Sequence, residues 1–141
     1  MRIGPHSVRG PNMAVDVVDN VIVVVHGPVA PTDEEWTAYL AVIERQGITR
    51  TAYLIEAGAG EPNQEQRRQR DELLAGHGAL PIAILSDIAR IRIAVMPLTW
   101  VRGFRLDEVS FALGYLRVPV GRRSAVRDKL DELRAYIREA R

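Results

Sequence analysis

The stretch VIVVVHGPVAPTDEEWTAYLAVI, residues 21–43, decides the fold class. It opens with Val21 to Val25, an unbroken apolar run of the kind found in an inner strand that helices cover on both faces. Thr32 then stands three residues before Glu35, which is the spacing of a capping box at the start of a helix. The residues that follow predict a helix over 33–46, with a buried stripe formed by Trp36, Tyr39, Leu40 and Ile43.

The residues before this stretch extend the predicted sheet. A second β-branched segment, 12–18, is joined to 21–26 by Asp19-Asn20, a dipeptide that favours a tight hairpin turn. We therefore expect an N-terminal β-hairpin. Residues 1–11 hold two glycines, two prolines and no long apolar run, and we expect them to form a flexible tail.

The residues after the first helix alternate between strand and helix patterns. We expect a strand over 51–57 and a short buried strand over 82–85. Between them, 62–75 reads as an unusually polar helix opened by a proline. Strands that alternate with helices are typical of an α/β fold with an open, mostly parallel sheet.

The last third of the chain contains one ambiguous segment. Residues 87–101 have the length of a helix, but part of the segment alternates like a strand and Pro97 would kink any helix that passes through it. A short strand is expected over 104–106 and a helix over 107–116. An apolar repeat at four, three and four residues predicts an extra C-terminal helix over 124–139.

Composition limits the classes of function. The chain of 141 residues has the length of one domain, and we place that domain at 12–141. A formal net charge of +1 gives no strong field for nucleic acid or an anionic membrane, and no apolar run approaches the length of a membrane span. The chain has no cysteine, which fits a reducing compartment. We therefore expect a cytoplasmic protein without a nucleic-acid partner.

Three local motifs resemble one protein family. The segments His26 to Pro31, Ile82 to Asp87 and Phe104 to Val109 are similar to bacterial STAS-like domains, the fold of anti-sigma-factor antagonists, which is related to CRAL-TRIO domains. The resemblance implies a helix over 87–101 and a regulatory domain that acts through protein–protein interaction. Regulated members of the family carry a phosphorylated serine or threonine after the third strand. Residues 57–63 contain neither, so we expect no phospho-switch at that place.

Candidate site residues form two groups. Exposed arginines of the polar helix and an apolar segment near Pro97 suggest a protein-binding surface, for which we select Arg67, Arg68, Arg70, Trp100 and Arg102. Strand ends and a glycine turn suggest contacts to an anion or another ligand, at Glu56, Gly58, Gly60 and Asp87. His26 is either a contact residue at a strand end or a structural histidine. The pattern predicts no catalytic group, no metal site and no cofactor.

Two functions compete on this basis. The first is a non-enzymatic, STAS-like regulatory module that binds a protein partner, including a second copy of itself, through the 62–75 helix and the 96–102 segment. The alternative is a domain that binds a small apolar ligand or a lipid in a pocket between the sheet and the helices. A deep cavity favours the alternative, whereas a fully packed interior excludes it. An enzyme with Glu56 or Asp87 as its base would need those carboxylates to meet in a cleft.

Overall fold

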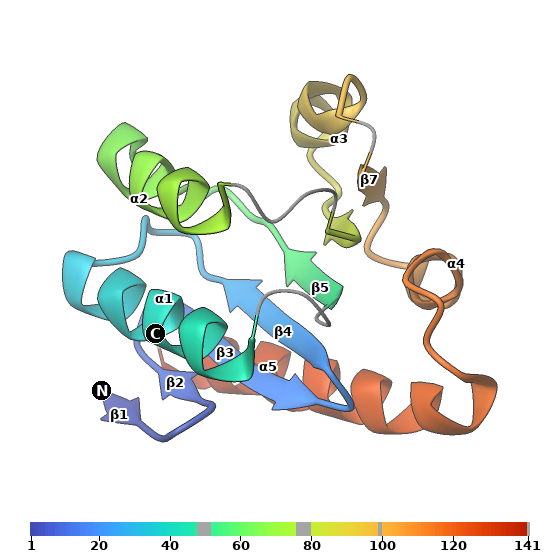
Figure 1. Cartoon of the computed structure of the whole chain (residues 1–141), viewed down its shortest axis with the longest axis horizontal. Coiled ribbons are helices and arrows are strands. Elements are labelled where there is room, and N and C mark those ends of the chain that lie inside the picture. Colours follow the sequence, from blue (N-terminus) through green and yellow to red (C-terminus); the bar gives the residue numbers. More distant parts are fainter. Residues whose placement is uncertain (48–51, 76–79, 99, 141) are drawn as a thin grey trace.

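A computed structural model describes residues 1–47, 52–75, 80–98 and 100–140 of the chain. One seven-stranded sheet runs through the molecule in the order β1-β2-β3-β4-β5-β6-β7, with helices on both of its faces (Figure 1). The elements are β1 (Arg2–Ile3), β2 (Val8–Arg9), β3 (Met13–Val18), β4 (Val21–His26), α1 (Asp33–Gln46), β5 (Ala52–Glu56), α2 (Gln64–Leu74), β6 (Ile82–Leu85), α3 (Ala89–Val95), β7 (Val101–Phe104), α4 (Val109–Tyr115), the 3-10 turn η2 (Val120–Arg122) and α5 (Arg123–Glu139).

The sheet is mixed. Strands β1 to β4 pair antiparallel, whereas β4 to β7 pair parallel, with a helix in each of the three parallel connections. The predicted hairpin is confirmed: Val18 pairs with Val21, and Asp19 and Asn20 both take positive φ in the turn. The α/β class is therefore confirmed, but the antiparallel half makes the sheet less parallel than expected.

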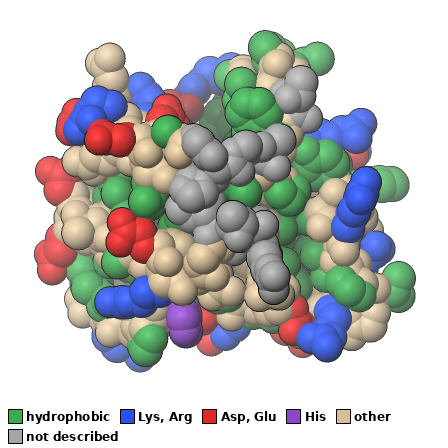
Figure 2. Space-filling view, in the orientation of Figure 1, with side chains coloured by type: hydrophobic (Ala, Val, Ile, Leu, Met, Phe, Trp, Pro, Cys, Tyr) green, Lys and Arg blue, Asp and Glu red, His purple; other side chains and the backbone are tan. Residues whose placement is uncertain are grey.

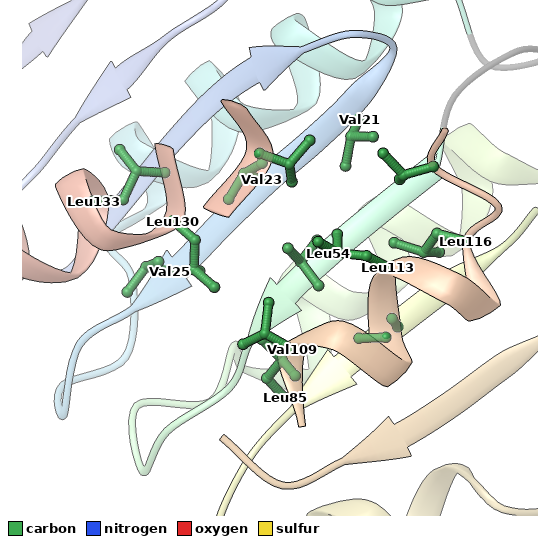
Figure 3. Packing of buried hydrophobic residues seen from close by; sticks show 14 of the residues in the cluster. Val21, Val23, Val25, Leu54, Leu85, Val109, Leu113, Leu116, Leu130 and Leu133 are labelled. Atoms are coloured by element: carbon green, nitrogen blue, oxygen red, sulfur yellow. The ribbon is translucent and has the colours of Figure 1, made fainter. Parts of the chain in front are cut away.

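One face of the sheet is closed by α4 and α5. Side chains that alternate along β4, β5 and β6 point toward these two helices, and Figure 3 shows Val23, Leu54 and Leu85 among them. The apolar stripe of α5, with Leu130 and Leu133 at its centre, packs on β3 and β4 of the same chain. This cluster fills most of that face, and one hollow of about 470 Å³, lined by Val25, Glu56, Arg134 and Ile137, lies between α5 and the ends of β4 and β5. The C-terminal helix predicted over 124–139 is a covering layer of its own sheet.

The opposite face is covered unevenly. Helix α1 packs its buried residues Trp36, Tyr39, Val42 and Ile43 on the half of the sheet that holds β2, β3 and β4. Its capping box forms as predicted, with the Thr32 hydroxyl accepting from the Glu35 amide and the Glu35 carboxylate accepting from the Thr32 amide. Helices α2 and α3 lie farther along this face, and they stand apart from each other (Figure 1).

The prediction of a flexible tail over 1–11 is wrong. These residues form β1 and β2, which continue the antiparallel half of the sheet, and Val8 is completely buried. The Arg9 guanidinium donates to the Val15 carbonyl (2.8 Å) and to the Asp16 carboxylate (2.8 Å). Strands of two residues leave no periodic signal in a sequence, so only these contacts reveal them.

The prediction of a helix over 87–101 is correct only for its first half. Helix α3 ends at Val95, because Pro97 has no amide hydrogen for a helical bond and its ring clashes with the preceding turn. The chain then re-enters the sheet as β7, so the last strand is 101–104 and not 104–106. Residue 99 of the predicted helix and residue 51 of the predicted third strand lie outside the described residues.

Within the described residues, the structure holds no helix that is both long and apolar enough to cross a membrane.

Candidate ligand-binding cleft

A cleft lies between α2 and α3, with strands β5 and β6 as its floor. It consists of two adjoining hollows of about 480 and 260 Å³. Figure 2 shows a recess at this place, between α2 and α3, with hydrophobic side chains around it. Both hollows touch the same central residues, which are Tyr39, Ile55, Arg70, Ile84 and Val95.

Helix α2 borders the cleft because polar contacts tie it to α1. The buried residue of α2 is Gln66, whose side-chain Nε2 atom donates to the Pro31 carbonyl (2.9 Å) and to the Asp33 carboxylate (3.1 Å). The indole N–H of Trp36 donates to the Gln66 carbonyl (2.8 Å). A helix with one buried polar residue has no apolar stripe to lay on the sheet, so α2 stays at the rim.

Helix α3 borders the other side because it packs on β7. Its buried residue is Ile91, and Gly103 of β7 lies so close to Arg92 that an added Cβ would be 3.0 Å from the Arg92 Cα. The Arg92 guanidinium also donates to the Ser86 carbonyl (2.7 Å). With α2 held by α1 and α3 held by β7, neither helix closes over the strands between them.

The floor of the cleft is an apolar surface that no helix buries. Ile55, Ile82 and Ile84 are only partly buried, whereas their neighbours on the opposite face of the same strands, Leu54 and Leu85, are fully covered by α4 and α5. Successive residues of a strand point to opposite faces of the sheet. The difference in burial between the two faces therefore comes from the helices that cover them. The cleft thus offers the apolar lining that is usual in small-molecule sites.

Two tyrosines stand at the bottom of the larger hollow. Tyr53 is 2% exposed, and its buried hydroxyl has no hydrogen-bond partner among the described residues. Burial raises the pKa of Tyr53, and the neighbouring Tyr39 adds to the rise. Burial also raises the pKa of Tyr39, to about 12, although the Arg70 guanidinium opposes the rise. Both phenols are therefore protonated at neutral pH, and the Tyr53 hydroxyl is a free donor beside the cleft.

His26, at the carboxyl end of β4, lines the smaller hollow. Its Nδ1 atom is buried and has no hydrogen-bond partner in the part of the chain that the structure describes. Burial, and after it the Arg70 charge, lower the pKa of His26 to about 4, although the buried Glu35 carboxylate opposes the change. The ring is therefore neutral at pH 7. Because its Nδ1 atom makes no hydrogen bond to a described residue, His26 does not match the prediction of a structural histidine with satisfied hydrogen bonds.

Arginines supply the charge of the cleft. Arg70 lies between the two hollows and is half-buried. Its ion pair with the exposed Asp71 carboxylate is long, 3.3 Å from Nη2. Arg67 lines the smaller hollow and donates to the Pro62 carbonyl (2.7 Å). Arg90 and Glu61 meet at 2.8 Å on the same hollow and neutralise each other.

The cleft brings together part of the predicted sites. Arg67, Arg70 and Trp100 line it, and so do Gly58 and Gly60. At Gly60 an added Cβ would collide with the Gly27 and Val29 carbonyl oxygens, and its amide donates to the Gly27 carbonyl (3.2 Å), so its first role is close backbone packing.

The other predicted residues lie elsewhere. Arg68 is on the outer side of α2, paired with Glu65 (2.7 Å) and Glu72. Arg102 stands over the Tyr115 ring, 5.9 Å from its centroid. Glu56 pairs with Arg134 of α5 on the opposite face of the sheet, and Asp87 accepts from the Leu106 amide (3.1 Å). Each of the two carboxylates that were candidate bases thus has a structural contact of its own.

Sequence reasoning missed the residues that give the cleft its polarity. Tyr39 and Tyr53 read as ordinary core residues, and Gln66 read as part of a solvated helix face. One signal was present: the 64–70 run has no apolar residue to bury, which already implied that this helix does not seal the sheet.

Comparison of the chain with protein-family models, with curated proteins and with solved structures finds no match.

Proposed function

We propose that this domain is a non-enzymatic binding module that holds a small, largely apolar molecule in the cleft between α2 and α3. The observation that carries the proposal is the apolar floor of β5 and β6, which no described helix covers and which borders hollows of about 480 and 260 Å³. The larger hollow lies in the size range of ordinary ligand pockets.

Polar atoms in the cleft support the same proposal. The Tyr53 hydroxyl and the His26 Nδ1 atom are buried without a partner. An unpaired buried polar group costs about 1–3 kcal/mol, so a folded chain retains few of them. Two such atoms at one cleft are the small set of orienting groups that a mostly apolar binding site needs.

Binding of N-phenyl-1-naphthylamine, an uncharged probe that fluoresces in apolar sites, tests this function. Val95 lines both hollows from α3, so Val95→Trp should fill the cleft and weaken probe binding at least tenfold. Ile93→Trp is the matched control, because Ile93 is on the same helix, lies outside both hollows and is 62% exposed. Equal probe binding by wild type and Val95→Trp would contradict the proposal.

A second candidate is a STAS-like regulatory module that binds a protein partner. The observation that favours it is the outer side of α3, where Ile93 and Met96 are 62% and 75% exposed beside the β7 edge. Exposed apolar side chains of this size are typical of interaction surfaces. A partner captured by the wild type and lost with Met96→Asp would favour this candidate, and a partner retained by that variant would count against it.

A further inference from the structure

We infer that the ligand of the cleft carries an anionic group, held at Arg70, on an otherwise apolar body. The inference rests on the proposed function, and it adds the chemical class of the ligand. Its starting point is the position of Arg70, which lines both hollows and therefore stands where they join.

The groups around Arg70 favour a negative charge over a neutral polar group. Arg70 presents N–H donors, the Tyr53 hydroxyl is an unpaired donor, and His26 presents an unpaired ring nitrogen at the smaller hollow. A carboxylate or sulfonate accepts several hydrogen bonds at once and forms charge-assisted bonds with a guanidinium. An anionic group at Arg70 would therefore form charge-assisted bonds with the guanidinium, and the Tyr53 hydroxyl of the larger hollow, which has no partner among the described residues, is a further donor.

The formal charges of the lining agree with this assignment. The cationic residues are Arg67, Arg70 and Arg90, and the acidic residues are Glu61 and Asp71. Glu61 is matched by Arg90 at 2.8 Å, and Asp71 is exposed and 3.3 Å from Arg70. One positive charge remains in excess, that of Arg67, which lines the smaller hollow together with Arg70.

The apolar body has its own place. Beyond Arg70, the larger hollow is lined by Leu74, Ile82, Leu98 and Trp100, together with the isoleucines that the two hollows share. These residues offer aliphatic and aromatic contacts and no further cation. A ligand with its charge at Arg70 would thus extend its apolar part over β5 and β6.

Two probes separate the anionic group from the apolar body. The probe 8-anilinonaphthalene-1-sulfonate has the ring system of N-phenyl-1-naphthylamine plus one sulfonate. We expect the wild type to bind the sulfonate probe about tenfold more tightly, as one charge-assisted hydrogen bond allows. Arg70→Gln should remove this preference and change the affinity for the uncharged probe less than about twofold.

Arg68→Gln provides the matched control. It removes the same charge from the same helix, but Arg68 lies on the outer side, paired with Glu65 and Glu72, and lines neither hollow. We expect no more than about a twofold change in the affinity for either probe, because an exposed charge is screened by salt. Far-UV circular dichroism of both variants verifies that they are folded.

The outcomes distinguish the inference from the proposed function. Equal affinity of the wild type for the two probes, with both blocked by Val95→Trp, would overturn the anionic group and leave the cleft as a binding site. A loss of the sulfonate preference in Arg68→Gln as large as in Arg70→Gln would also overturn the role of Arg70. Probe binding that Val95→Trp does not affect would overturn the proposed function itself.

Discussion

Removal of the Tyr53 hydroxyl should stabilise the unliganded protein. Tyr53 is 2% exposed and its hydroxyl has no hydrogen-bond partner among the described residues. Folding therefore removes this group from water without giving it a new hydrogen bond. Such a group costs about 1–3 kcal/mol, and we take the lower end because the hydroxyl borders a cleft. Tyr53→Phe keeps the ring and removes only the oxygen. We therefore expect the free energy of unfolding to rise by about 1 kcal/mol.

Tyr136→Phe is the matched control for this substitution. The Tyr136 hydroxyl donates to the Arg9 carbonyl (2.9 Å), so its removal breaks a hydrogen bond and should lower the free energy of unfolding by about 1 kcal/mol. Urea titrations followed by circular dichroism measure both changes, provided that the slope of the transition stays the same. The sulfonate probe should bind Tyr53→Phe about fivefold more weakly, because an orienting donor is lost. A loss of stability in Tyr53→Phe equal to that in Tyr136→Phe would refute the argument.

Two further substitutions test the surroundings of the cleft. Gly60→Ala should lower the free energy of unfolding by about 2 kcal/mol or more in a urea titration, because the new Cβ collides with the Gly27 and Val29 carbonyl oxygens. Gly121→Ala is the control and should be close to neutral, because nothing lies within 4 Å of the added Cβ. Equal effects of the two substitutions would contradict the packing role of Gly60. His26 has a pKa of about 4 in the folded chain against 6.5 when exposed, so the unfolded chain binds more protons between these two pH values. The free energy of unfolding should therefore fall by up to about 3 kcal/mol as the pH drops from 6.5 to 4. Urea titrations of His26→Gln across that pH range should show a smaller loss, whereas an unchanged loss would mean that His26 is not its source.

Strong local signals made the centre of the fold predictable. The run 21–25, the capping box at Thr32 and the stripe of the C-terminal helix each depend on nearby residues, and the structure has all three where expected. Residues 1–11 and the second half of 87–101 were predicted incorrectly for different reasons. Strands β1 and β2 have two residues each and pair with close neighbours, so they are too short to leave a periodic pattern. Strand β7 forms because it pairs with β6, and local propensity says little about such pairing.

The candidate site was only partly predictable. Arg67, Arg70 and Trp100 could be selected because arginine and tryptophan are enriched in protein interfaces, but their common position depends on how α2 and α3 are held apart. That separation follows from the Gln66 contacts to α1 and from Gly103 beneath Arg92. Neither contact follows a regular residue spacing, so no sequence pattern predicts it. For the same reason, a buried hydroxyl without a partner, as at Tyr53, becomes visible only once the packing is known.

Nuclear magnetic resonance locates the bound probe most directly. In amide spectra of the labelled protein titrated with 8-anilinonaphthalene-1-sulfonate, a cleft site should shift the Tyr53, Ile84 and Val95 amides and the Trp100 indole N–H, all of which belong to lining residues. Signals of Leu130 and Leu133, in the packed core on the other face, should stay in place. Shifts confined to the outer side of α3, at Ile93 and Met96, would contradict the assignment of the cleft as the binding site.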